Sequence, residues 1–167
     1  MFSVNEILDL AIQIEKNGES VYRRAMEEIN ESELTTLLEW MADEEIKHAD
    51  WFASLKDTIE STGVNLFVEE MSRELFNDLL GEKSFSHKDV DFSKLKSTNE
   101  LISVFIEFEK DTVIFYEVLV PFIEDAGTLE TLDRIISEEN NHIRRLQEFL
   151  QSEGERTSER LILNPFH

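Results

Sequence analysis

The sequence predicts an all-α fold, a four-helix bundle made of two antiparallel hairpins that are joined by a long crossover. Three observations support this prediction. Only 5 Gly and 2 Pro interrupt 167 residues, which favours long helices because these residues are the strongest breakers of regular structure. Apolar residues recur with helical spacing in four segments. Residues 64–97 form a connector long enough to lead the chain along the bundle before the second hairpin begins.

The first hairpin is predicted from its capping residues and its apolar periodicity. Ser3 and Glu6 have the spacing of a capping box, and apolar residues then recur on one helix face as far as Ile29. We expect a second helix to begin near Ser32. It should end at Gly63, because glycine is the residue that most often terminates helices.

The second hairpin follows the same logic. Ser97 and Glu100 form another capping box, which opens a third helix that we expect to run to about Phe122. A fourth helix is expected from about Leu129 to Leu150, again from its apolar periodicity.

These elements give one bundle domain at residues 1–153, with its crossover at 64–97, and a loosely attached C-terminal tail at 154–167. Within the crossover, residues 66–80 have a helical pattern. A four-helix bundle with one long crossover has the ferritin-like topology.

The chain is strongly acidic and contains no cysteine. Its 37 acidic and 16 basic residues give a formal net charge of −21 and a sequence pI near 4.4. Such a surface repels phosphate backbones and anionic lipids, so we expect no nucleic-acid or membrane partner. Residues 1–13 lack the basic region of a signal peptide, which favours a cytoplasmic location. The absence of cysteine excludes thiol nucleophiles and Cys-ligated metals.

The most informative feature is an internal repeat. Four pairs of residues are each separated by 94 positions: Glu15 and Glu109, Tyr22 and Tyr116, Glu45 and Glu139, and His48 and His142. The chain has only two tyrosines, and both take part in the repeat. Glu44 and Glu138 also match, but they lie one position off the shared face, so we expect them at the surface or beside the repeated residues.

The spacing within each half is that of a metal site. Glu45 and His48 are three residues apart and therefore project from one helix face, as do their counterparts. Glu15 and Glu109 lie on apolar faces, where an unpaired carboxylate costs several kcal/mol. Four carboxylates balance the charge of two divalent cations. A Glu from each of two helices with Glu-x-x-His from the other two is the donor set of di-iron and di-manganese bundles.

Mixed oxygen and nitrogen ligands suit iron or manganese. We therefore predict a site for two iron ions, with manganese as the alternative, held by Glu15, Glu45, His48, Glu109, Glu139 and His142.

The segments EKNGESVY, ADEEIKHADWF, EKDTVIFY and SEENNHIRRL resemble the rubrerythrin branch of the ferritin-like di-iron proteins. The resemblance covers both hairpins and implies the same six ligands. Tyr22 and Tyr116 resemble the family's tyrosines, whose hydroxyls hydrogen-bond to ligand carboxylates. The sequence leaves open whether Glu15 and Glu109 are terminal ligands or whether all four glutamates share the bridging role.

The sequence departs from rubrerythrins in two respects. Rubrerythrins proper carry a rubredoxin domain with four cysteines, and this chain has none, so electrons must come from a separate donor. The family places a second Glu three residues after its third-helix ligand, and here that position is Thr112. Its counterpart in the repeat is Gly18, which predicts either a path for a small molecule or close packing.

The resemblance implies a non-haem di-iron oxidoreductase that reduces peroxide or dioxygen and forms a homodimer. Three alternatives remain from the sequence. These are ferritin-like iron storage, manganese catalase-like disproportionation of peroxide, which needs no electron donor, and a structural or regulatory bundle with a vestigial site.

Overall fold

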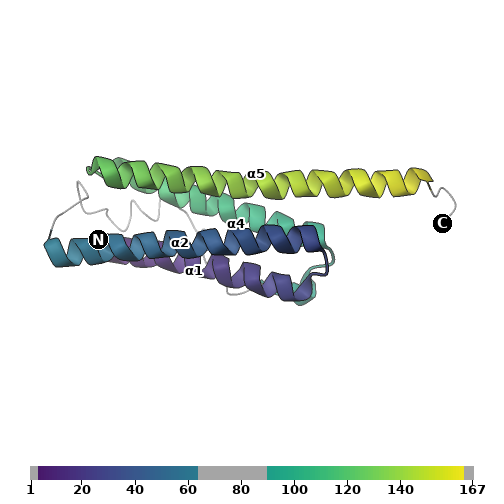
Figure 1. Cartoon of the computed structure of the whole chain (residues 1–167), viewed down its shortest axis with the longest axis horizontal. Helices are drawn as coiled ribbons and strands as arrows, with labels where there is room; N and C mark the ends of the chain where they lie inside the picture. Colours follow the sequence, from purple (N-terminus) through teal and green to yellow (C-terminus); the bar gives the residue numbers. More distant parts are fainter. Residues whose placement is uncertain (1–3, 64–89, 164–167) are drawn as a thin grey trace.

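The computed structural model describes residues 4–63 and 90–163, and every regular element in these residues is helical (Figure 1). Four long helices form the bundle, which confirms the predicted fold class. The predicted cap at Ser3 and the helical pattern at 66–80 lie outside the described residues. No helix in the described ranges combines the length and the apolar character needed to cross a membrane.

The first hairpin consists of α1 (Val4–Glu28) and α2 (Ser32–Thr62), which pack against each other along their length (Figure 1). Helix α2 begins and ends as predicted. Gly63 follows its last residue with φ 64°, in the left-handed region that glycine adopts without strain, and its N–H donates to the carbonyl of Ile59 at 3.0 Å.

The second hairpin begins with α4 (Thr98–Leu119), which starts at its predicted cap. The Ser97 hydroxyl accepts from the backbone N–H of Glu100 at 3.2 Å. The Glu100 carboxylate accepts in turn from the N–H of Lys96 at 2.8 Å, one residue before the partner of an ideal capping box. The chain then tightens into a short 3-10 helix, η3 (Val120–Phe122), so the prediction that the third helix runs to about Phe122 is close.

The last helix, α5 (Ala126–Leu163), is longer than predicted. An end near Leu150 is wrong, because the segment expected to be a tail from residue 154 continues the helix. Figure 1 shows this part of α5 projecting past the ends of the other helices. Arg156 anchors it to the first hairpin, since its guanidinium lies 2.9 Å from the carboxylate of Glu33. The division of the chain at residue 153 stays a prediction.

Aromatic side chains connect the two hairpins in the core. The ring of Tyr22 in α1 meets Phe105 in α4 edge to face at 4.9 Å between centroids. Phe52 in α2 lies 5.2 Å from Tyr116 in α4. All four residues are buried. Large aromatic side chains contribute much of a core's burial energy, so these contacts help to hold α1 and α2 against α4.

The described end of the crossover contains a second short 3-10 helix, η2 (Phe92–Lys94). The guanidinium of Arg24 in α1 lies over the ring of Phe92, 4.7 Å from its centroid. This cation–π contact fixes the incoming chain against α1 just before α4 begins.

Candidate metal centre

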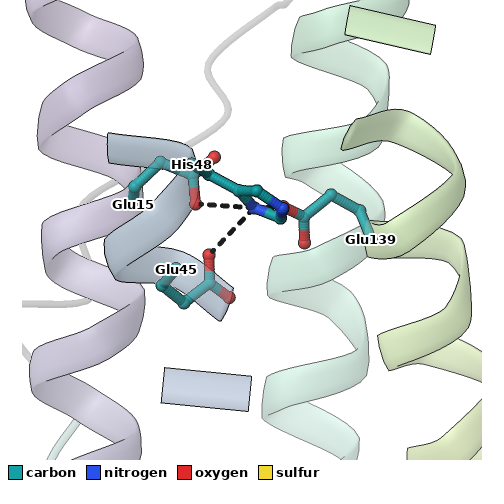
Figure 2. Close-up of side chains that lie close together, drawn as sticks. All are labelled: Glu15, Glu45, His48 and Glu139. Atoms are coloured by element: carbon teal, nitrogen blue, oxygen red, sulfur yellow. Dashed lines mark ion pairs between the residues drawn. The ribbon is translucent and has the colours of Figure 1, made fainter. Parts of the chain in front are cut away.

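The six residues predicted as metal ligands meet in the interior of the bundle. Helices α1 and α4 each contribute one Glu, and α2 and α5 each contribute a Glu-x-x-His pair. None of the six is more than 3 % exposed. Figure 2 shows four of them, from three helices, turned toward one another: Glu15, Glu45, His48 and Glu139.

The donor atoms form two overlapping groups, and within each group they all lie within 4.8 Å of one another. Glu45 and Glu139 belong to both groups, whereas Glu15 and Glu109 each belong to one. Two ions bound there would share Glu45 and Glu139, whereas Glu15 and Glu109 would each serve one ion, a choice that the sequence leaves open. The groups are Glu15, Glu45, His48 and Glu139, and Glu45, Glu109, Glu139 and His142.

Both imidazoles present the same nitrogen to the carboxylates. The Nδ1 atom of His48 lies 2.8 Å from Glu139 and 3.6 Å from Glu15. The Nδ1 atom of His142 lies 3.1 Å from Glu139 and 3.5 Å from Glu109. Each group therefore combines one imidazole nitrogen with carboxylate oxygens, which is the donor set that iron and manganese accept.

The hydrogen bonding of the centre is incomplete. Three buried carboxylate oxygens have no hydrogen-bond partner among the described residues: Glu15 Oε2, Glu45 Oε1 and Glu109 Oε2. A buried acceptor that is left unsatisfied costs about 1–3 kcal/mol, and native proteins seldom carry several such groups side by side. Two divalent cations would satisfy these oxygens and balance the four carboxylates, so the residues present fit a dinuclear metal site.

The carboxyl groups differ in their affinity for protons. Burial and the neighbouring carboxylates raise the pKa of Glu45 well above its ordinary value. Burial and the charge of Glu139 raise the pKa of Glu109 to about 8. Burial also opposes the charge of Glu139, but the contacts with His142 and His48 outweigh it and lower the pKa of this group.

The histidines show the opposite balance. Burial disfavours the imidazolium form, but the contacts with Glu139 and Glu15 prevail and raise the pKa of His48 to about 12. The contacts with Glu109 and Glu139 likewise raise the pKa of His142 to about 10. Protons therefore take the place of cations in the metal-free centre, and metal binding must displace them.

The two tyrosines bind the carboxylates crosswise. The hydroxyl of Tyr22 in α1 donates to Glu109 in α4, and the hydroxyl of Tyr116 in α4 donates to Glu15 in α1. Burial, followed by the neighbouring carboxylates, raises the pKa of both phenols well above its ordinary value, so they remain protonated donors. Each of these contacts orients a carboxylate that belongs to only one of the two groups.

Replacing Tyr22 by Phe is expected to lower the free energy of unfolding by about 1–3 kcal/mol, because it removes a donor to a buried carboxylate. Tyr116→Phe is the matched variant and should have an effect of similar size, since it removes the equivalent bond to Glu15. Urea denaturation of the metal-loaded protein measures both. An unchanged unfolding midpoint in either variant would contradict the structural role of that bond.

Two further side chains lie against the histidines. Glu138 Oε2 lies 2.9 Å from Nε2 of His48, whereas the sequence allows a surface position as well. The ring of Trp40 meets His142 edge to face, with 5.1 Å between centroids. The repeat signals Glu138, whereas the contact of Trp40 with His142 joins two helices and has no equivalent in the repeat, because the counterpart of Trp40 is Arg134.

Gly18 is buried against the metal centre. A Cβ atom at this position would lie 3.0 Å from Cε1 of Phe108 and 3.3 Å from the carboxyl carbon of Glu45. Of the two alternatives predicted for this glycine, the structure therefore favours close packing over a path. Thr112, its counterpart, is also buried, and its hydroxyl has no hydrogen-bond partner within residues 4–63 and 90–163.

Gly18→Ala is expected to destabilise the protein by about 1–2 kcal/mol, because overpacking outweighs the gain of about 1 kcal/mol in helix propensity. Gly154→Ala is the control. A Cβ atom there meets nothing within 4 Å, so this variant should gain up to about 1 kcal/mol. Thermal unfolding compares the two variants, and stabilisation by both would show that Gly18 is not sterically required.

Comparison with known proteins agrees with this geometry. A solved structure from Thermotoga maritima, described as a ferritin-like diiron-carboxylate protein, matches with a TM-score of 0.65 and 26 % sequence identity. The match covers 90 % of this chain and 95 % of the other. The fold and the buried Glu and His cluster thus define a ferritin-like diiron-carboxylate protein.

The family itself is identified from the sequence. A model of the rubrerythrin family matches residues 6–150, which is most of the chain. The protein therefore belongs to the rubrerythrin family. No curated protein matches the chain at a comparable level of significance.

Proposed function

We propose that this protein is an oxidoreductase that reduces peroxide or dioxygen at a dinuclear iron centre. The observation that supports the proposal is the buried cluster in which two carboxylates, Glu45 and Glu139, are shared between two groups of metal-binding residues. A pair of adjacent redox-active ions suits a two-electron reaction. Membership of the rubrerythrin family supports the choice of iron.

When bound, two ferrous ions supply one electron each to hydrogen peroxide, so that its O–O bond breaks and two protons are taken up to give two waters. The chain contributes the surroundings of this reaction. Tyr22 and Tyr116 hold the terminal carboxylates in place. Buried aromatic residues, among them Phe105 and Phe108, keep bulk water away from the centre.

Regeneration of the ferrous state needs an external electron donor, because the chain has no cysteine with which to hold a redox centre of its own. We further propose a cytoplasmic homodimer without nucleic-acid or membrane partners. The charge of −21 supports the last point, since it disfavours anionic surfaces.

The reaction is tested with protein loaded anaerobically with two ferrous ions per chain. After addition of one equivalent of hydrogen peroxide, stopped-flow absorbance follows the formation of ferric iron. We expect oxidation much faster than that of the same iron without protein, and Glu139→Gln should remove the acceleration. Equal rates with and without the protein would overturn the proposal.

Two alternatives are separated by simple measurements. Iron storage needs a closed shell, so a native mass of two to four subunits would exclude a cage of about 24. Manganese catalase-like activity predicts manganese in protein purified without added metal, and oxygen release from peroxide in the absence of a donor.

A further inference from the structure

The two halves of the metal centre differ at the outer edge of their histidines. His48 and His142 occupy equivalent positions in the repeat, and both turn Nδ1 toward the carboxylates. The Nε2 atom of His48 lies 2.9 Å from the carboxylate of Glu138. The Nε2 atom of His142 is buried and has no hydrogen-bond partner among the described residues.

The repeat offers His142 an equivalent carboxylate, but the structure does not use it. Glu44 is the counterpart of Glu138, and its carboxylate accepts from Lys47 at 2.6 Å. The space beside His142 is taken by Trp40, whose ring stands at 87° to the imidazole. The counterpart of Trp40 is Arg134, so the two sides of the centre differ in sequence at this point.

A carboxylate that accepts a hydrogen bond from Nε2 fixes where a metal-binding imidazole carries its proton. Because a carboxylate accepts, Nε2 carries the proton, and the lone pair of Nδ1 is left to face the cations. The same bond fixes the orientation of the ring and raises the basicity of the ligand. His48 has this support from Glu138, whereas an aromatic edge supplies only packing to His142.

Glu138 is accessible enough to be replaced without disturbing the core. Its side chain is 37 % exposed, and it lines a pocket of about 290 Å³ together with His48, Glu44 and Trp51. A smaller side chain at this position leaves space that water can fill. Loss of the contact with His48 can therefore be separated from loss of the fold.

We propose that Glu138 is a positioning residue that makes the two metal positions unequal. The position formed by Glu15, Glu45, His48 and Glu139 binds its ion more tightly than the position that includes Glu109 and His142. This inference rests on the metal centre of the proposed function and is independent of the reaction that the centre performs.

The test is a calorimetric titration of the metal-free full chain with Co²⁺. The wild type is expected to bind two ions with distinct affinities. Glu138→Ala should weaken the tighter step about 10- to 100-fold, the range typical for loss of such a partner, and leave the other step unchanged. Glu130→Ala is the control, since Glu130 is exposed on the same helix and belongs to neither group of metal-binding residues, and this variant should keep both affinities.

Three further variants assign the two binding steps and test the role of Glu138. Glu15→Gln should weaken the tighter step, and Glu109→Gln should weaken the other, because each glutamate belongs to one group. Glu138→Gln keeps an oxygen acceptor for Nε2 and should recover part of the affinity that Glu138→Ala loses. Equal losses in Glu138→Ala and Glu138→Gln, or a loss of the same size in Glu130→Ala, would overturn the positioning role.

The outcomes separate this inference from the proposed function. If Glu138→Ala binds both ions as tightly as the wild type, the inference fails and the proposed reaction is untouched. If the wild type binds two unequal ions but does not accelerate peroxide reduction, the proposed reaction fails and the inference stands. A wild type that binds no metal would overturn both.

Discussion

Glu139→Gln is expected to abolish the binding of both metal ions and to lower the free energy of unfolding of the metal-free protein by about 3–5 kcal/mol. Glu139 belongs to both groups of donor atoms. Its carboxylate also lies within 3.1 Å of Nδ1 of both His48 and His142. The amide removes a bridging ligand and leaves two buried imidazolium groups without their common counter-charge.

The measurements are the metal content after dialysis against a ferrous or manganous buffer and urea denaturation of the metal-free protein. Glu130→Gln is the control, because Glu130 is exposed on the same helix and loses the same charge. It should retain two ions per chain and wild-type stability. A Glu139→Gln protein that still holds two ions would show that the carboxylate does not bridge them.

Removal of the metal ions is expected to lower the melting temperature more at pH 8 than at pH 5.5. In the metal-free protein the raised pKa values of Glu45 and Glu109 mean that folding retains protons which the unfolded chain releases. Their stabilising contribution is complete below the ordinary carboxyl pKa of about 4.5 and, for Glu109, is lost as the pH rises through about 8.

The histidines act in the same direction. The contribution of the protonated His48 and His142 is complete below the unfolded pKa of about 6.5, and it is lost as the pH rises toward about 10–12. Glu139, whose pKa is lowered, adds stability that is lost only below about pH 4.5, outside this window. The metal-free protein therefore weakens between pH 5.5 and 8, whereas bound cations replace the protons.

Differential scanning calorimetry of chelated and metal-loaded protein measures the difference at each pH. At a free metal concentration about 100 times the Kd, the loaded protein should melt about 5–10 °C higher at pH 8. The difference should be smaller at pH 5.5, where protons compete for the ligands. Glu139→Gln, treated in the same way, should show no response to the chelator. An equal difference at both pH values would contradict the proton linkage.

Most of the fold could be predicted from the sequence, because local chemistry sets the helix ends. Gly63 ends α2 and Ser97 caps α4 through contacts with residues nearby in the chain. The end of α5 could not be predicted in this way. The helix continues to Leu163, and the contact of Arg156 with Glu33, 123 residues earlier, is one that no local signal reports.

The convergence of the six ligands could be predicted because their spacing places them on inward helix faces in both halves. Their surroundings could not, since the repeat makes the halves look equal. Glu138 lies against His48, whereas Glu44 pairs with Lys47, a residue whose counterpart in the repeat is Asn141. Close packing at Gly18 likewise depends on Phe108 from another helix.

The crossed bonds from tyrosine to glutamate carry a consequence for the architecture as a whole. Each hairpin supplies one phenol and needs one from the other, through Tyr22 to Glu109 and Tyr116 to Glu15. Neither hairpin is self-sufficient, yet each offers what its neighbour lacks. Two copies of a single hairpin, related by a twofold axis, would make the same crossed bonds. Because one chain joins the two hairpins here, the sequence of each hairpin can change separately while both bonds are kept.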